Sequence, residues 1–398
     1  MARLLLLLVC FIVACNAGET RVHYIAADEV IWDYAPSGIN LVNGNPLLED
    51  ENAAVFFEEG PDRIGGKYLK AIFREYKDSS FNELMDDDDE MRHKGILGPI
   101  IWAEVGDTIK VVFKNNGRFD FSVHPHGVFY SKESEGAKYP DGTFPAGDSV
   151  APGDTYTYTW PVPARAGPGP GDWSSMVWTY HSHVEETKGT NSGLVGAIVI
   201  TAKGFAHPNG HPKDVDREAF LFYTVFDENN SPYLDANLEM FVTGDHEELL
   251  EDGDFEESNL MHALNGYLYN NMPEVTFNLG ERVRWYVLAM GTEVDLHSAH
   301  WHGNSLLKNR DHRLSSDIIV PGTTVTLDMV PDVVGKWQVE CHVNDHLGAG
   351  MLATYTVVGD MQQRDYASMS DPFAFLWDSE PNVVYVYESV SSASAVVI

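Results

Sequence analysis

The sequence predicts an all-β chain whose strands pack as β-sandwiches. Short runs of residues alternate between apolar and polar side chains along most of the chain. Clusters of glycine, proline and asparagine interrupt these runs, and no long stretch shows the periodicity of a helix. Many short alternating strands separated by frequent turns favour β-sandwiches over helical or mixed folds.

The alternation is clear in four segments. They span residues 108–114, 155–160, 283–287 and 324–329, and in each one the apolar side chains fall on every second position. Successive side chains of a strand point to opposite faces, so this pattern is typical of a half-buried strand. Turn-forming residues separate the strands, as in residues 161–172 and 229–232.

A weak internal repeat predicts two domains. Residues 101–114 and 274–288 each contain a strand, a glycine followed by an acidic residue, and a second strand. A histidine-rich segment follows in both halves, and each half closes on an apolar strand, at residues 193–200 and 348–357. We therefore expect domains at 18–204 and 205–358, with a C-terminal extension at 359–398.

The first residues predict secretion. Arg3 precedes an apolar run over residues 4–14, and small residues follow near Ala17. The run is too short to cross a bilayer, so we expect residues 1–17 to be a cleaved signal peptide and the protein to be extracellular without a membrane span. The net charge of −34 argues against nucleic acid and anionic membranes as partners.

Cysteine usage singles out one residue. Cys10 and Cys15 lie in the predicted signal peptide, so the mature chain keeps only Cys341. Secreted proteins usually pair their cysteines in disulfides, and one unpaired thiol needs an explanation. The simplest explanation is a buried, inert side chain. The neighbours of Cys341 favour a metal ligand instead.

Nine of the 16 histidines fall in four short motifs. Residues two apart on a strand project to the same side, so each His-x-His pair offers two imidazoles to one place. Such repeated clustering predicts metal binding. The motifs are His124-Pro-His126, His181-Ser-His183, His297-Ser-Ala-His300-Trp-His302, and Cys341-His342 followed by His346.

The last motif predicts a redox-active copper. Cys341, His346 and Met351, with a histidine from an earlier strand such as His297, supply a thiolate, two imidazoles and a weak thioether. That combination is typical of blue-copper centres, whereas zinc prefers four strong ligands. His342 follows Cys341 but points to the opposite face of the strand. It can therefore link the blue copper to a second metal cluster.

The order of these motifs resembles the multicopper oxidase family, in its ceruloplasmin- and hephaestin-like form. The resemblance covers about His23–Val358 and includes short sequences outside the histidine motifs. It implies two cupredoxin domains, which are Greek-key β-sandwiches. The short sequences that carry it include Trp32-Asp-Tyr-Ala35, Gly98-Pro-Ile100, His126-Gly-Val, Glu135-Gly-Ala-Lys-Tyr-Pro-Asp141, Phe226-Asp-Glu228 and Glu257-Ser-Asn259.

The resemblance also implies copper ligands of three types. The type 1 ligands would be His297, Cys341, His346 and Met351, and the type 2 ligands His124 and His300. The type 3 ligands would be His126, His181, His183, His302 and His342. Glu340 stands where the family has one more type 3 histidine. Glutamate is a harder, anionic donor, so it either replaces that ligand or impairs the type 3 pair.

Two further departures concern stability and calcium. The cysteine pair that often links strands of the first domain is missing before His181, which should cost stability and not chemistry. The calcium loop of the family is matched only in part, around Lys132 and Asp148. Calcium is therefore possible as an additional cofactor.

An iron site is also implied. Ferroxidases of the family hold iron(II) near the type 1 copper with carboxylates and a histidine, which here would be Glu257, His262, Asp345 and Glu293. Hard oxygen donors favour iron(III), so they would ease the release of an electron. Oxidation of phenols or amines, and a non-enzymatic copper-binding role in the extracellular matrix, are the alternatives.

The expected function is thus a secreted ferroxidase that uses iron(II) and O2. Ceruloplasmin-like proteins arrange six cupredoxin domains in a ring, with oxygen-reducing clusters between domains. A chain with two domains would complete such a ring as a homotrimer.

Overall fold

A computed structural model describes residues 18–359, except 87 and 293–294. The predicted signal peptide and residues 360–398 of the predicted extension lie outside the described residues. The described part contains four β-sheets and only short helices, so the prediction of an all-β chain is confirmed.

Two sheets are built from the first half of the chain. Sheet 1 has the strand order β2-β1-β4-β6, and sheet 2 has the order β3-β8-β7-β5. Their strands are β1 (Thr20–Asp33), β2 (Lys67–Tyr76), β3 (Ile100–Glu104), β4 (Thr108–Asn115), β5 (His124–Pro125), β6 (Thr155–Pro161), β7 (Ser175–His181) and β8 (Val195–Thr201).

The other two sheets are built from the second half of the chain. Sheet 3 has the order β10-β9-β12-β17-β14-β15, and sheet 4 has the order β11-β19-β18-β13-β16. Their strands are β9 (Arg217–Asp227), β10 (Leu260–Leu264), β11 (Val275–Asn278), β12 (Val283–Ala289), β13 (His297–Trp301), β14 (Leu306–Lys308), β15 (His312–Leu314), β16 (Ser316–Ile319), β17 (Thr324–Met329), β18 (Gly335–Cys341) and β19 (Leu352–Val358).

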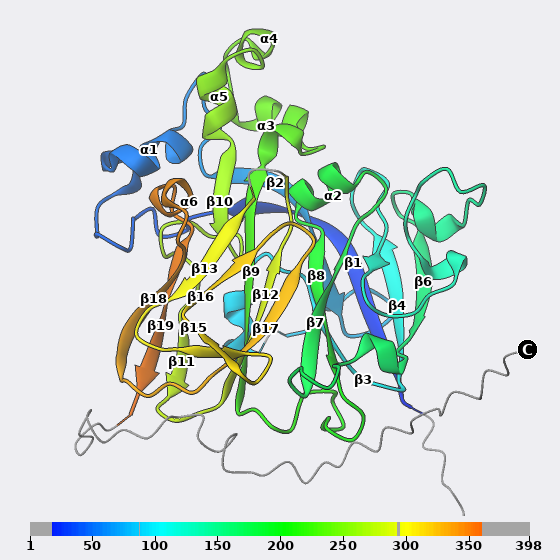
Figure 1. The fold of residues 1–398 in the computed structure, drawn as a ribbon. Helices are drawn as coiled ribbons and strands as arrows, with labels where there is room; N and C mark the ends of the chain where they lie inside the picture. Colours follow the sequence, from blue (N-terminus) through cyan, green and yellow to red (C-terminus); the bar gives the residue numbers. More distant parts are fainter. Residues whose placement is uncertain (1–17, 87, 293–294, 360–398) are drawn as a thin grey trace, which may run out of the picture. The chain divides into compact units, whose positions relative to one another are not determined.

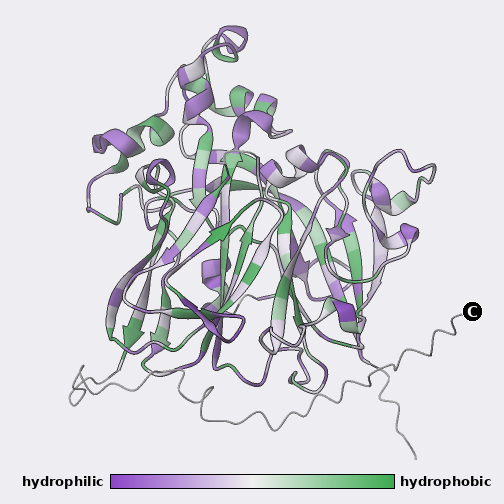
Figure 2. Ribbon diagram, in the orientation of Figure 1, coloured by the Kyte–Doolittle hydropathy of each residue, from purple (hydrophilic) through white to green (hydrophobic). Residues whose placement is uncertain are grey.

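The four sheets are stacked in the order 1, 2, 3, 4, with an apolar core in each of the three gaps (Figure 1). Strand β9 shows how the chain fills two cores at once. Leu221 and Tyr223 enter the core between sheets 3 and 4, while Phe220 and Phe222 enter the core between sheets 2 and 3. Because both faces of such a strand are buried, β9 reads as a continuous apolar run. Figure 2 shows the strands as largely hydrophobic and the loops and helices as largely hydrophilic.

Most helices lie together at one end of the sheets (Figure 1). Aspartates start three of them: the carboxylates of Asp50, Asp245 and Asp252 accept hydrogen bonds from N–H groups of the first turn of α1, α4 and α5. No helix among the described residues has the length and apolar character needed to span a membrane. The helices are α1 (Glu51–Phe57), α2 (Glu186–Ser192), α3 (Leu234–Phe241), α4 (His246–Leu249), α5 (Gly253–Ser258) and α6 (Asn344–Gly348).

Candidate metal centre

Three of the predicted type 1 ligands meet inside the second sandwich, and we call His297, Cys341 and His346 the thiolate set. His297 begins β13, Cys341 ends β18, and His346 lies in α6 directly after that strand. Strands β13 and β18 are antiparallel neighbours, which brings His297 beside Cys341. All three side chains are buried, and their ligand atoms lie within 4.8 Å of one another.

The distances in the thiolate set fit a trigonal metal site. The Cys341 Sγ atom lies 3.7 Å from His297 Nδ1 and 3.4 Å from His346 Nδ1, and the two nitrogens are 3.2 Å apart. These separations are short enough for one cation to reach all three atoms at ordinary metal–nitrogen and metal–thiolate lengths. Two imidazoles and one thiolate in a trigonal arrangement are the donor set of blue copper.

Met351 and Asp295 border the thiolate set. The Cys341 amide donates to the Met351 carbonyl at 3.0 Å, and the Met351 side chain is fully buried in the same core as Cys341. Asp295 Oδ1 lies 3.3 Å from His297 Nε2 and accepts a hydrogen bond from the Val225 amide. Burial raises the pKa of the Cys341 thiol. A bound cation would favour the thiolate, so metal binding and deprotonation are coupled here.

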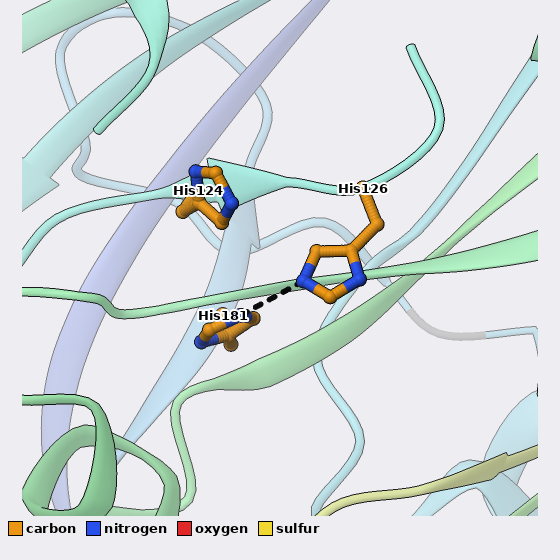
Figure 3. Close-up of side chains that lie close together, drawn as sticks. All are labelled: His124, His126 and His181. Atoms are coloured by element: carbon orange, nitrogen blue, oxygen red, sulfur yellow. Dashed lines mark hydrogen bonds between the residues drawn. The ribbon is translucent and has the colours of Figure 1, made fainter. Parts of the chain in front are cut away.

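A second group, His124, His126 and His181, lies at the edge of sheet 2, and we call it the first histidine set (Figure 3). Strands β5 and β7 pair His124 directly with His181, and His126 Nε2 lies 3.1 Å from His181 Nε2. The ring of His183 lies beside them, with its centroid 5.1 Å from that of His124.

The first histidine set has the hydrogen bonds and the protonation state that metal binding requires. His124 Nδ1 donates to the Glu135 carbonyl at 2.7 Å, and His181 Nδ1 donates to the Ser182 carbonyl at 3.1 Å. Each bond leaves the Nε2 lone pair for a metal, as is usual for metal-binding histidines. Burial lowers the pKa of His124 to about 4 and that of His181 to about 3. Both rings are therefore neutral near pH 7, the form that binds metals.

The third group, His300, His302 and Glu340, lies on the face of sheet 4 opposite the thiolate set, and we call it the carboxylate set. The register pairs His300 with Glu340 and Ala299 with Cys341, so Glu340 and Cys341 point to opposite faces. Glu340 Oε1 lies 3.4 Å from His302 Nε2 and 2.7 Å from His342 Nδ1. The thiolate and carboxylate sets are thus joined by one strand.

Among the described residues, each of the three sets draws its ligands from one half of the chain. The first histidine set belongs to sheet 2, and the carboxylate set faces away from the core on sheet 4. Sheet 3 and two apolar cores lie between these sheets. Within one chain, the two halves of the predicted type 2 and type 3 cluster therefore form separate sets.

Two of the predicted iron ligands, His262 and Asp345, lie beside a member of the thiolate set, His346. The His262 ring, on β10, lies 5.3 Å from the His346 ring between centroids. Burial lowers the pKa of His262 to about 4, and its Nδ1 donates to the Leu260 carbonyl at 2.9 Å. Glu257, at the end of α5, and Asp345, in α6, are exposed. These three do not form a ligand group within 4.8 Å in the described part of the chain, and Glu293 lies outside it.

The region that resembles a calcium loop holds a lysine among its acids. Lys132 Nζ lies 2.5 Å from Glu135 and 2.6 Å from Asp141, so its ammonium already balances these carboxylates. Burial raises the pKa of Asp148. Calcium stays a prediction.

Family models place the chain among known proteins. Two models described as "Multicopper oxidase" match residues 91–204 and 243–360. The chain is 45% identical over 347 residues to ceruloplasmin from Homo sapiens, covering 85% of this chain and 32% of that protein. It is 43% identical over 342 residues to ferroxidase HEPHL1 from Mus musculus and 40% identical over 345 residues to hephaestin from Homo sapiens, in each case covering 85% of this chain and 29% of the relative. The chain belongs to the multicopper oxidase family, as its motifs predict.

It spans about a third of the length of these relatives.

Solved structures show the same fold at low identity. A multicopper oxidase crystal structure matches with a TM-score of 0.55 and 18% identity, covering 85% of this chain and 89% of that one. A copper nitrite reductase from Nitrosomonas europaea matches with a TM-score of 0.55 and 19% identity, covering 86% and 95%. The prediction of cupredoxin-type sandwiches is confirmed. Family membership implies copper and supports an oxidoreductase.

Proposed function

We propose that this chain is a secreted multicopper oxidase that oxidises iron(II) and reduces O2 to water. The observation that carries the proposal is the position of Cys341. This residue is a member of the thiolate set. The residue before it, Glu340, belongs to the carboxylate set, and the residue after it, His342, contacts the Glu340 carboxylate. An electron accepted on the core side of β18 therefore has a short covalent route to the outer face.

The bound coppers would supply the chemistry 4 Fe(II) + 4 H⁺ + O2 → 4 Fe(III) + 2 H2O. The protein supplies the positions. His297, Cys341, His346 and Met351 would hold the type 1 copper in a dry core, where the buried side chains exclude water. His124 and His300 would be type 2 ligands, and His126, His181, His183, His302 and His342 would be type 3 ligands. Glu340 lies beside His302 and His342 and would supply an oxygen ligand.

The neutral ring of His262 supports an iron-binding role. It lies against His346, and its Nε2 remains unprotonated because Nδ1 donates to a carbonyl. Asp345 directly precedes His346, and Glu257 precedes His262 by five residues. The carboxylates would attract iron(II) and favour iron(III), while the contact between the His262 and His346 rings gives a short path to the thiolate set. The large negative charge of the chain would draw cations toward it.

We expect the double substitution Glu257→Ala and Asp345→Ala to raise the KM for iron(II) by about 10-fold or more, because two hard donors are lost. The blue absorption should stay unchanged, since neither residue belongs to the thiolate set. Steady-state O2 uptake at varied iron(II) concentration measures the first effect, and visible absorption measures the second.

The matched control removes two other exposed acids of α5, Asp254→Ala and Glu256→Ala. This variant loses the same net charge, so any change in long-range attraction of cations appears in both. An equal KM in the two double variants would contradict the iron site and leave oxidation of an organic substrate as the better account.

Assembly is part of the proposal. We infer that three chains form a ring in which the first histidine set of one chain meets the carboxylate set of the next. Two features support this: each chain holds both half-sets, and His302 and His342 are half-exposed at 44% and 59% of their side-chain surface. Head-to-tail contacts that close into a ring leave no unpaired half-set.

Two predictions from the sequence complete the proposal. The apolar segment after Arg3 supports secretion, because its length suits a signal peptide. The division into domains at 18–204 and 205–358 is supported by the gap between β8, which ends at Thr201, and β9, which begins at Arg217.

A further inference from the structure

Lys70 and Glu228 form a fully buried ion pair between the two halves of the chain. Neither side chain has any exposed surface, although Lys70 lies on β2 of sheet 1 and Glu228 directly follows β9 of sheet 3. Glu228 Oε1 accepts hydrogen bonds from Lys70 Nζ and from the Tyr34 hydroxyl, whereas Glu228 Oε2 has no hydrogen-bond partner among the described residues. Burying two charges is costly, and apolar residues of similar volume often stabilise a fold equally well. Stability alone therefore does not account for this pair.

Lys70 holds the end of helix α2. Its Nζ donates to the Asn191 carbonyl at 2.6 Å, in the last turn of that helix. Helix α2 lies in the loop of residues 182–194, which follows β7 and which we call the α2 loop. A side-chain carbon at Gly189 of α2 would lie only 2.9 Å from the Cβ atom of Ser182, so the helix packs directly on the first residue of the loop. Lys70 therefore supports the backbone that carries the second His-x-His motif.

The other end of the buried pair holds a second segment, residues 257–262, which we call the α5–β10 corner. The Glu228 amide donates to the Asn259 carbonyl at 3.0 Å, in the middle of this corner. Tyr68, on the same strand as Lys70, donates its hydroxyl to Asn259 Oδ1 at 2.7 Å, and Asn259 is fully buried. Two predicted iron ligands are the first and last residues of the corner. One buried polar cluster thus contacts both the α2 loop and the α5–β10 corner.

We propose that Lys70 and Glu228 are positioning residues of the oxidase, which fix the α2 loop with His183 relative to the α5–β10 corner with His262. Both segments lie at the end of the sheets where the helices gather (Figure 1). Charged hydrogen bonds are directional, whereas apolar contacts of the same volume would leave the two segments free to shift. The inference rests on the proposed iron oxidation, because the corner carries predicted iron ligands. Lys70 and Glu228 are themselves not predicted ligands, so their effect passes through α2 and Asn259.

The test replaces the buried pair with apolar residues, as Lys70→Met and Glu228→Leu together in the full-length, copper-loaded chain. We expect this double variant to unfold at the wild-type temperature or above, because the desolvation cost is removed. Its kcat/KM for iron(II) should nevertheless fall by about 10-fold, since small displacements of reacting groups are costly. Amide hydrogen exchange in residues 189–193 and 259–262 should become about 10-fold faster, because these segments would open locally. Lys70→Met alone should unfold at a lower temperature, since it leaves a buried carboxylate without its cation.

The matched control is a second double variant, Leu238→Met and Met261→Leu. Both changes conserve volume in the apolar core between sheets 2 and 3, and Met261 directly precedes His262. This control should keep the wild-type kcat/KM and the wild-type exchange rates in both segments. Equal kinetics and equal exchange in the two double variants would show that the buried pair serves stability only, and would overturn the proposal.

Two further outcomes remain decisive. If the apolar pair prevents folding, Lys70→Gln with Glu228→Gln takes its place with the same readouts, and unchanged exchange in both segments would again overturn the proposal. If the wild-type protein does not oxidise iron(II), the proposed function fails by itself. The exchange rates of residues 189–193 and 259–262 still test whether the buried pair fixes the two segments, because that measurement needs no turnover.

Discussion

The substitution Cys341→Ser is expected to abolish both the blue colour and all oxidase activity. The intense band of a blue-copper centre arises from the bond between copper and a thiolate, and serine cannot supply that soft donor. Cys341 also begins the covalent route to His342, so electrons from the substrate would not reach the outer face of sheet 4. Visible absorption of the copper-loaded protein and O2 uptake with iron(II) measure the two losses.

Met351→Leu is the matched control, because it changes a fully buried neighbour in the same core without removing a strong ligand. The axial thioether is weak, so this variant should keep the blue band, with a shift, and most of its activity. If copper-loaded wild-type protein has no blue band, the thiolate set is not a type 1 site.

Co-expression of two inactive variants is expected to restore oxygen reduction. One variant carries His126→Ala and His181→Ala, which disable the first histidine set. The other carries His300→Ala and His302→Ala, which disable the carboxylate set. If clusters form between neighbouring chains, random mixing leaves about a quarter of the interfaces with both sets intact. O2 uptake by the purified mixture should therefore approach about a quarter of the wild-type value.

Each variant expressed alone serves as the control and should show no oxygen reduction above the Cys341→Ser background. A mixture as inactive as its components, although it contains hetero-oligomers, would contradict clusters between chains. Light scattering on the wild-type protein adds a separate check. Full activity at the mass of one chain would rule out the ring.

The strands of the sandwiches could be predicted because apolar and polar side chains alternate along a strand that has one buried face. The repeat of strand, glycine with an acid, and strand corresponds to β3–β4 and to β11–β12. Strand β1 was not predicted, since Ala26 and Ala27 are small and successive residues there are buried on both faces. The helices α1 and α5 were missed for another reason. They are only one or two turns long and depend on aspartate caps rather than on a periodic apolar face.

The ligand sets could be predicted because their members are close in sequence or share a face of a strand. His300 and His302 form such a pair, and Cys341 lies five residues before His346. The residues that orient them could not be found in this way. Ser316 is brought to His300 by the pairing of β13 with β16, and Asp295 is fixed by the Val225 amide of a distant strand. Such partners depend on tertiary packing, although Asp295 could have been noticed from its place two residues before His297.

The measurement that tests the account most directly is the ratio of iron(II) oxidised to O2 consumed by the copper-loaded protein. We expect about four iron(II) ions per O2, no hydrogen peroxide, and loss of this activity in Cys341→Ser, because a copper held by the thiolate set would pass single electrons to the site that reduces oxygen. Copper bound at full occupancy, with O2 uptake no faster than in Cys341→Ser, would contradict it.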